Sequence, residues 1–270
     1  LLGLLPLQWV LSVDVITATL AVLPLLFVAI PQPAERGVSE HANPVRAVAT
    51  DMVAGLRYVR AWPGLLALVG VAMALNLLLT PVSSFTPLLV TKHFGGGAVE
   101  LGWLESALGV GVIAGGLTLG VWGGFKRRIL TSLAGILGIS VGVLLMGVAP
   151  ANRLWVGLAG MFVMGFTNPL ANGPIFAIIQ STVKPEMQGR VMGLLGSGAA
   201  AMMPIGLLMA GPLADRIGIR PLYIIGGVAC AVIAVGSAFI RPLMNIERNA
   251  TAPTPEPPPT ALAPEPTCCD

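Results

Sequence analysis

The chain has 270 residues, of which 55% are hydrophobic and 10% are charged, and its mean hydropathy is +0.87. Because about a quarter of the residues in a soluble domain are charged, this composition excludes an ordinary soluble domain. The net charge of +3 does not indicate a nucleic-acid partner, since the cations fall in short segments between apolar stretches.

The first predicted membrane span covers about residues 8–30 and ends at the helix-stopping sequence Pro31–Pro33. It contains Asp14, the one carboxylate well inside an apolar run. A polar segment, 32–63, follows. Within it, apolar residues recur every three or four positions after Asn43–Pro44, a pattern that predicts a helix lying at the membrane surface.

The second predicted span covers about residues 65–89, with interruptions at Thr80–Pro81 and Pro87. The uncharged stretches 106–125 and 129–152 form the third and fourth spans, because each is long enough to cross the ~30 Å hydrocarbon core as a helix. Glycines four apart on these two helices predict close helix packing. They are Gly111 and Gly115, Gly116 and Gly120, and Gly138 and Gly142.

The fifth predicted span covers about residues 154–180 and is expected to bend or open at Asn168–Pro174, where nearby amides can bond the carbonyls that prolines free. The sixth covers about 191–212 and the seventh about 222–240. The tail after Glu247 is rich in proline and is predicted to be disordered. The sequence thus predicts an all-α polytopic membrane protein with seven transmembrane helices.

The distribution of cations predicts the orientation of these helices. Eleven of the fifteen Lys and Arg residues fall on the side of segment 32–63, including Lys126, Arg127 and Arg128 in the turn between the third and fourth spans. Cytoplasmic loops carry the excess of Lys and Arg, so this segment and the C-terminus are predicted to be cytoplasmic. Four cations fall on the other side: Lys92, Arg153, Arg216 and Arg220.

No arrangement of residues indicates an enzyme. The sequence lacks GxSxG, HExxH and a phosphate-binding loop, and no two carboxylates share a helix face. Neither the three cysteines nor the two histidines have the spacing of a metal site or a disulfide framework. We therefore predict no enzymatic activity, no cofactor and no metal. A retinal protein is excluded because no lysine lies within the last span.

Four stretches resemble the major facilitator superfamily of transporters, specifically its drug-exporter branch, which includes macrolide efflux proteins and the enterobactin exporter. They are LSVDVITA (Leu11–Ala18), LGVWGGFKRRI (Leu119–Ile129), TVKPEMQGRVMGLL (Thr182–Leu195) and GPLADRIGIRPLYIIGG (Gly211–Gly227). The resemblance implies that the seven spans are helices six to twelve of a twelve-helix fold, with the preceding helices of the N-terminal half in a part of the protein that this sequence lacks.

On this view the chain divides into four parts. Residues 1–31 end the N-terminal bundle, and residues 32–63 form the central cytoplasmic loop with its amphipathic helix. Residues 64–244 form the C-terminal six-helix bundle, and residues 245–270 form the Pro-rich cytoplasmic tail. The implied location is the inner (plasma) membrane of a bacterium.

Transporters of this type usually carry the sequence GxxxDRxGRR in cytoplasmic loops. Here the turn that begins at Gly120 keeps the cations of that sequence but has Gly124 at the acidic position. A closer match in letters includes Asp215, Arg216 and Arg220, but the cation distribution places it on the external side. We expect Asp215 to pair with Arg216 or Arg220 and to brace the last helical hairpin.

Two acids are candidates for proton coupling, namely Asp14 and Glu105, because a carboxylate costs about 3 kcal/mol at the centre of a bilayer and is retained for a reason. The alternative for each is a hydrogen bond to a neighbouring helix. The uncharged polar residues within spans are candidates for lining a substrate pathway, or alternatively for bonding between helices. They are Asn76, Asn168, Asn172 and Gln180.

The predicted function is secondary active transport: proton-coupled efflux of hydrophobic or amphipathic small molecules, such as macrolides, by alternating access. Its expected partners are the substrate, protons, the lipid bilayer and the N-terminal half of the same transporter. Two alternatives remain open at this stage. One is export of a siderophore or another metabolite, and the other is a truncated membrane protein that does not transport.

Overall fold

The computed structural model describes residues 7–23 and 44–247, and all the elements within these residues are helices. This confirms the all-α prediction for the described part of the chain. The helices are α1 (Leu7–Val22), α2 (Pro44–Ala61), α3 (Pro63–Ser84), α4 (Thr86–Lys92), α5 (Ala98–Trp122), α6 (Arg128–Val148), α7 (Leu154–Thr182), α8 (Pro185–Ile217), α9 (Ile219–Ala238) and α10 (Arg241–Met244).

Six helical segments are long and apolar enough to cross a membrane: α3 with α4, α5, α6, α7, α8 and α9. They coincide with the second to seventh predicted spans, so six of the seven are confirmed. Within the first predicted span the structure describes the 16-residue helix α1, so whether this segment crosses the membrane stays a prediction. Residues 24–30 of that prediction lie outside the described residues, as does the tail 248–270.

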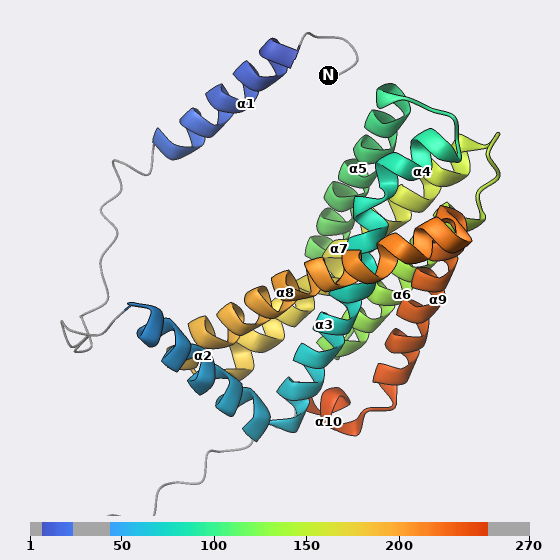
Figure 1. Cartoon of the computed structure of the whole chain (residues 1–270). Helices are drawn as coiled ribbons and strands as arrows, with labels where there is room; N and C mark the ends of the chain where they lie inside the picture. Colours follow the sequence, from blue (N-terminus) through green and yellow to red (C-terminus); the bar gives the residue numbers. More distant parts are fainter. Residues whose placement is uncertain (1–6, 24–43, 248–270) are drawn as a thin grey trace, which may run out of the picture.

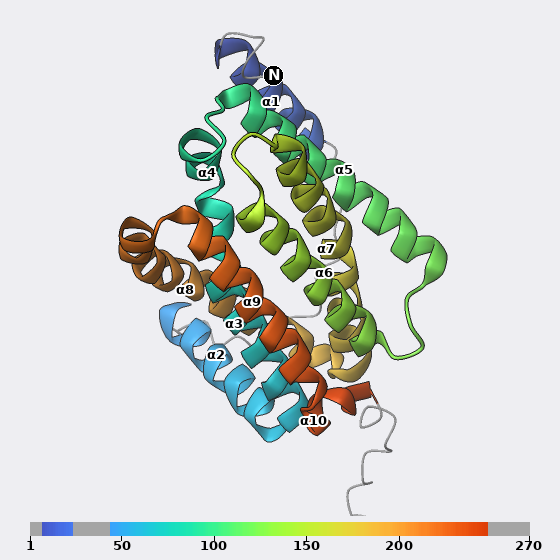
Figure 2. The same ribbon diagram turned by 90° about the vertical axis from the view of Figure 1, so that its right-hand side faces the viewer.

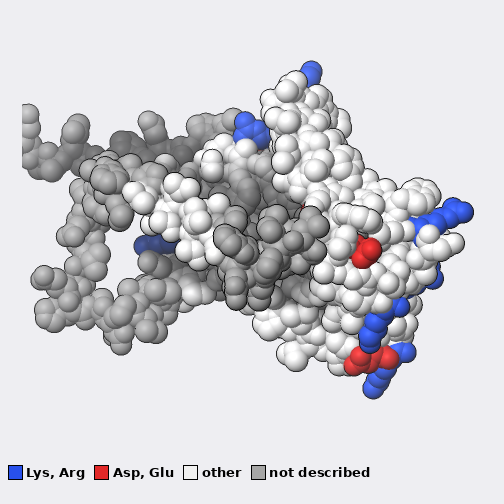
Figure 3. All heavy atoms as spheres, turned by 90° about the horizontal axis from the view of Figure 1, so that it is seen from above, with Lys and Arg blue, Asp and Glu red and all other residues white. Residues whose placement is uncertain are grey.

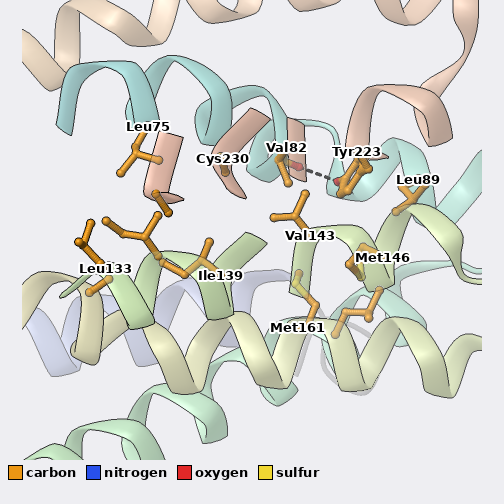
Figure 4. Close-up of a cluster of buried hydrophobic side chains, with 14 of the residues drawn as sticks. Leu75, Val82, Leu89, Leu133, Ile139, Val143, Met146, Met161, Tyr223 and Cys230 are labelled. Carbon is orange, nitrogen blue, oxygen red and sulfur yellow. Dashed lines mark hydrogen bonds between the residues drawn. The ribbon is translucent and has the colours of Figure 1, made fainter. Parts of the chain in front are cut away.

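The spanning helices form one bundle with α6 inside it. Helix α6 packs against α7 on one side and α9 on the other, α7 also packs against α5, and α3 packs across α8 (Figures 1 and 2). The apolar cluster between them includes Leu133, Val143, Met146, Met161 and Cys230 (Figure 4). Helix α1 lies apart from this bundle in Figure 1.

The predicted glycine pairs differ in what they face. Gly111 and Gly115 lie on the side of α5 that touches α7, where a Cβ at Gly115 would stand 2.7 Å from the carbonyl carbon of Phe166. The contact between these helices therefore requires glycine. The prediction is wrong for Gly116 and Gly120, because a Cβ at either position would meet no atom within 4 Å. A spacing of four groups residues on one face without saying which face packs.

On α6 the predicted pair Gly138 and Gly142 does face α7. A Cβ at Gly142 would lie 2.7 Å from the backbone oxygen of Gly160, and one at Gly138 would lie 2.9 Å from the Cβ of Thr167. Helices in lipid associate mainly by such close packing, since apolar burial gives no advantage over lipid tails. The close contacts of α5, α6 and α7 thus hold the wall of the cavity described below.

Prolines break one of the spans where the sequence predicts it and leave others intact. Phe85 separates α3 from α4, two residues before Pro87, whose missing N–H leaves the carbonyl of Ser83 without its helical donor. The predicted interruption at Pro81 is wrong, because α3 continues through it. Helix α7 also does not open at Asn168–Pro174, and it runs unbroken to Thr182.

Segment 32–63 does form a helix after Asn43, namely α2, whereas its location at the membrane surface stays a prediction. Val59 is fully buried in a second apolar cluster with residues of α3, α7 and α8. Gly55 approaches α8 so closely that a Cβ there would lie 3.2 Å from the backbone oxygen of Arg190. Met52, Val53 and Leu56 are exposed. Helix α2 thus packs on the bundle with one face and leaves apolar side chains on another.

The loops fall at two ends of the bundle, as the cation distribution predicts. At one end, Arg128 Nη1 at the start of α6 lies 3.4 Å from the carbonyl oxygen of Ala177 near the end of α7. At the other, His93 Nε2 after α4 lies 2.9 Å from the carbonyl oxygen of Ala149 after α6. Which end faces the cytoplasm stays a prediction.

Candidate functional site

A cavity of about 370 Å³ opens between α3 and α7, with residues of α5 and α6 at its wall. Its lining is mainly apolar, but it includes three of the four predicted pathway residues: Asn76 from α3 and Asn168 and Asn172 from α7. The structure thus brings together amides that lie almost a hundred residues apart in the sequence. Ligand sites commonly combine an apolar wall with a few such polar groups.

The α3 side of the cavity carries a line of three polar side chains, Asn76, Thr80 and Ser83. Asn76 Nδ2 donates to the carbonyl oxygen of Ala72 at 2.9 Å, and Thr80 Oγ1 donates to that of Asn76 at 2.7 Å. These bonds within one helix satisfy the Thr80 hydroxyl and one of the two N–H groups of the Asn76 amide. Among the described residues, the Asn76 side-chain oxygen receives no hydrogen bond and remains an acceptor for a guest.

The α7 side presents two exposed amides. Asn172 Nδ2 donates to the backbone oxygen of Asn168 at 3.1 Å. The expectation that an amide would bond the carbonyls freed by Pro169 and Pro174 is wrong for Asn172, because those are the carbonyls of Gly165 and Leu170. The Asn168 side chain has no hydrogen bond to any described residue, so both its donor and its acceptor are free.

Gln180 does not belong to this cavity. It is exposed near the end of α7, where its backbone oxygen accepts a hydrogen bond from Gln188 Nε2 at 2.9 Å. This bond links α7 to α8 across the turn between them. Three of the four predicted pathway residues therefore meet at one cavity, and the fourth lies at an end of the bundle.

Of the two predicted proton-coupling acids, Glu105 does not line the cavity. Glu105 is exposed on α5, one residue after the buried Leu104. Asp14 lies in α1, but its side chain is outside the described residues. Among the residues that the structure describes, no charged residue lines the cavity. Polar selectivity there rests on amides and hydroxyls alone.

The turn between α5 and α6 explains the missing acidic residue. Gly123 and Gly124 have φ values of +73° and +81°, and a Cβ at Gly124 would lie 2.8 Å from Thr131 Oγ1. That oxygen accepts a hydrogen bond from the backbone N–H of Phe125 at 2.8 Å. An acidic side chain at position 124 would be strained, since left-handed backbone favours glycine.

The predicted pairing of Asp215 with Arg216 or Arg220 is wrong for the described residues, among which neither pair forms. Arg220 instead donates from Nε to the carbonyl oxygen of Gly147 at 3.1 Å and from Nη2 to that of Val148 at 3.4 Å. It thereby braces the start of α9 against the end of α6. The expectation of a brace holds, but the acceptors are backbone oxygens at a helix C-terminus, which attract cations.

The sequence profile of the Major Facilitator Superfamily matches this chain over residues 1–206 and, in a second alignment, over residues 80–266. The chain belongs to the Major Facilitator Superfamily. Members of this family are membrane transporters and not enzymes, which agrees with the six apolar spans and with the absence of an enzyme motif. The predicted family, fold type and non-enzymatic nature are confirmed.

Three proteins named as efflux proteins are among its relatives. Macrolide efflux protein A of Streptococcus pyogenes is 29% identical over 238 residues, which are 88% of this chain and 58% of that protein. The protein of the same name from Enterococcus faecalis is 31% identical over 73% of the chain and 60% of its own length. Multidrug efflux pump Tap of Mycolicibacterium fortuitum is 30% identical over 78% and 51%. The chain thus spans just over half the length of these relatives.

Sequence reasoning missed the two hydroxyls of the cavity, Thr80 and Ser83. A signal for them was available, because Asn76, Thr80 and Ser83 are spaced four and three residues apart and therefore share one helix face. A polar line within an apolar span indicates a face that does not contact lipid.

Proposed function

We propose that this chain supplies the C-terminal half of a proton-driven exporter of amphipathic small molecules, with the cavity between α3 and α7 as its share of the substrate path. The observation that carries the proposal is the meeting of Asn76, Asn168 and Asn172 at one largely apolar cavity. Apolar walls bind the hydrophobic part of a substrate, and the amides orient its few polar groups. The relatives named as macrolide and multidrug efflux proteins support this choice of substrate class.

Alternating access accounts for the position of the cavity. In transporters of two related halves, the site lies between the halves, and rocking of one against the other exposes it to each side in turn. The N-terminal half would cover the open side of this cavity, with segment 32–63 as the cytoplasmic link. Proton binding at Asp14 or Glu105 would favour one of the two states, since a ligand shifts a conformational equilibrium by its differential affinity.

The test measures macrolide accumulation in energised bacteria that lack their own exporters. It compares the chain alone with the chain joined to an N-terminal half from a macrolide efflux protein. We expect efflux only from the joined form, abolished when the proton gradient is collapsed. Correct insertion of both forms without efflux from either would refute the proposal, and export of a siderophore alone would replace the substrate class.

A matched pair of variants tests the cavity itself. Thr80→Val removes a hydroxyl from its wall, and Thr118→Val removes one from an exposed position on α5; both hydroxyls donate to the carbonyl four residues earlier at 2.7 Å. Equal changes in efflux by the two variants would contradict the assignment. We expect the first alone to change the relative efflux of different macrolides.

A further inference from the structure

Two other cavities adjoin one another on the side of the bundle formed by α3, α4, α8 and α9. One, of about 420 Å³, is lined by apolar residues and glycine, among them Pro81, Ala210 and Leu222. The other, of about 440 Å³, contains charged residues and lies at the turn between α8 and α9. Neither includes a residue of the cavity between α3 and α7.

The same helix faces line both cavities, so together they form one groove. On α8, Gly206 and Ala210 line the apolar cavity, and Ala214, four residues further on, lines the charged one together with Gly218, which directly follows the helix. Residues four apart lie above one another on a helix. From Gly206 to the end of α8 at Ile217 the helix rises about 17 Å at ~1.5 Å per residue, close to the ~15 Å of one leaflet's hydrocarbon.

The charged end has hydrogen-bonding capacity left for an anion. Lys92 is exposed, and its ammonium group makes no bond to any described residue. Arg220 uses two of its five N–H groups on backbone oxygens of α6 and keeps the others. The remaining titratable groups are Asp215, a single carboxylate, and His93, whose Nε2 faces the oxygen of Ala149.

Seen from this end of the bundle, most Lys and Arg side chains and the visible acidic ones lie toward one edge, and uncharged atoms cover most of the rest of the described face (Figure 3). Two cations against one carboxylate leave the groove's end with a net positive charge. This charge repels a cationic amphipathic molecule. A free anion without an acyl chain would leave the apolar part of the groove unfilled. An anionic headgroup joined to an acyl chain satisfies both ends.

We propose that this groove binds one phospholipid with an anionic phosphodiester headgroup, such as phosphatidylglycerol. Lys92 and Arg220 hold the phosphate, and an acyl chain lies along the apolar faces of α3, α8 and α9. The lipid comes from the leaflet on the side of the turn between α8 and α9. Binding of this lipid needs no transport, so the proposal stands or falls independently of the exporter function.

The test uses the purified 270-residue chain in detergent and native mass spectrometry to count bound lipid. The probes are phosphatidylglycerol and phosphatidylcholine with identical acyl chains, and glycerol phosphate as a headgroup without chains. We expect phosphatidylglycerol to bind about tenfold more tightly than phosphatidylcholine, the effect of a charge-assisted hydrogen bond. Equal binding of the two lipids, or displacement of the lipid by an equal concentration of glycerol phosphate, would overturn the proposal.

Two matched pairs of variants locate the lipid. Lys92→Gln should abolish the preference for phosphatidylglycerol, whereas Arg216→Gln, an exposed cation outside the cavity lining, should keep it. A Cβ at Gly226 would lie at ordinary contact distance from Val82 Cγ2, 3.4 Å, and from the backbone oxygen of Leu78, 3.9 Å. A longer side chain from this lining position occupies the groove, so Gly226→Leu should weaken the binding of both lipids. Gly236→Leu, on open surface of the same helix, should not. An unchanged preference in Lys92→Gln would refute the headgroup site even if the glycine variants misfold.

Discussion

The packing of α5 on α7 can be tested by substituting two adjacent glycines of α5. Gly115 faces α7, and Gly116 faces open space, so one substitution can be made at both positions with opposite results. A Cβ at Gly115 would lie 2.7 Å from the carbonyl carbon of Phe166 and 3.0 Å from its Cα, and would also collide with its oxygen. A Cβ at Gly116 would meet no atom within 4 Å.

The expected change in the free energy of unfolding combines two opposing effects, steric overlap between the helices and the higher helix propensity of alanine. Carbon atoms pack best at about 3.5–4.0 Å, so Gly115→Ala requires the helices to separate by roughly 1 Å. The opposing atoms belong to the backbone and cannot rotate away, which places the cost near the upper end of the ~1–3 kcal/mol that overpacking takes. Alanine gains up to about 1 kcal/mol of helix propensity at either position. Gly115→Ala should therefore lower the free energy of unfolding by about 2 kcal/mol, and Gly116→Ala should not lower it.

The assay is thermal unfolding of the detergent-purified chain, followed by tryptophan fluorescence and by the fraction that stays monodisperse after heating. Gly115→Ala should unfold well below the wild type, and Gly116→Ala at or slightly above it. A second substitution on open surface, Gly120→Ala, should behave like Gly116→Ala. Equal unfolding temperatures for the two adjacent variants would refute the packing of α5 on α7.

Tyr223 Oη donates to the carbonyl oxygen of Val82 at 2.6 Å, so Tyr223→Phe should lower the free energy of unfolding by about 1 kcal/mol. Tyr58→Phe should leave it unchanged, because the Tyr58 hydroxyl has no hydrogen bond to any residue that the structure describes. An equal loss in both would contradict this bond. For the orientation, cysteines introduced as Lys126→Cys and Arg216→Cys into a cysteine-free chain should be labelled only from the cytoplasm and only from outside, respectively. Opposite labelling would place the turn between α8 and α9 inside.

The spanning helices were predictable because each requires only a long uncharged stretch, which hydropathy reports directly. The partners of those helices were not predictable in the same way. Gly111 and Gly116 begin two pairs with the same spacing, yet only the first pair packs on α7. In lipid, both faces of a helix are apolar, so hydrophobic periodicity does not tell the packed face from the lipid-facing one.

The polar residues within spans were easy to find in the sequence, and their grouping was not. Asn76 and Asn168 meet across a cavity, whereas Gln180, of the same type, lies at a turn. For Arg220, the nearby Asp215 suggested an ion pair, but backbone oxygens of α6 are its acceptors. From the sequence, a charged residue nearby in the chain is the expected partner. The packing of α9 on α6 instead places Arg220 beside backbone acceptors about seventy residues earlier in the chain.

The described lining of the cavity is uncharged, which assigns substrate binding and proton coupling in the proposed exporter to different residues. Amides and hydroxyls bind a partly polar guest without the desolvation cost of a buried charge. Such groups do not titrate between the two states, so they cannot couple transport to protons. Because Glu105 lies outside the lining, proton binding there would act on transport through helix packing and not through contact with the substrate. Glu105→Gln should then change the proton dependence of efflux and leave macrolide preference unaltered, whereas Thr80→Val should do the reverse.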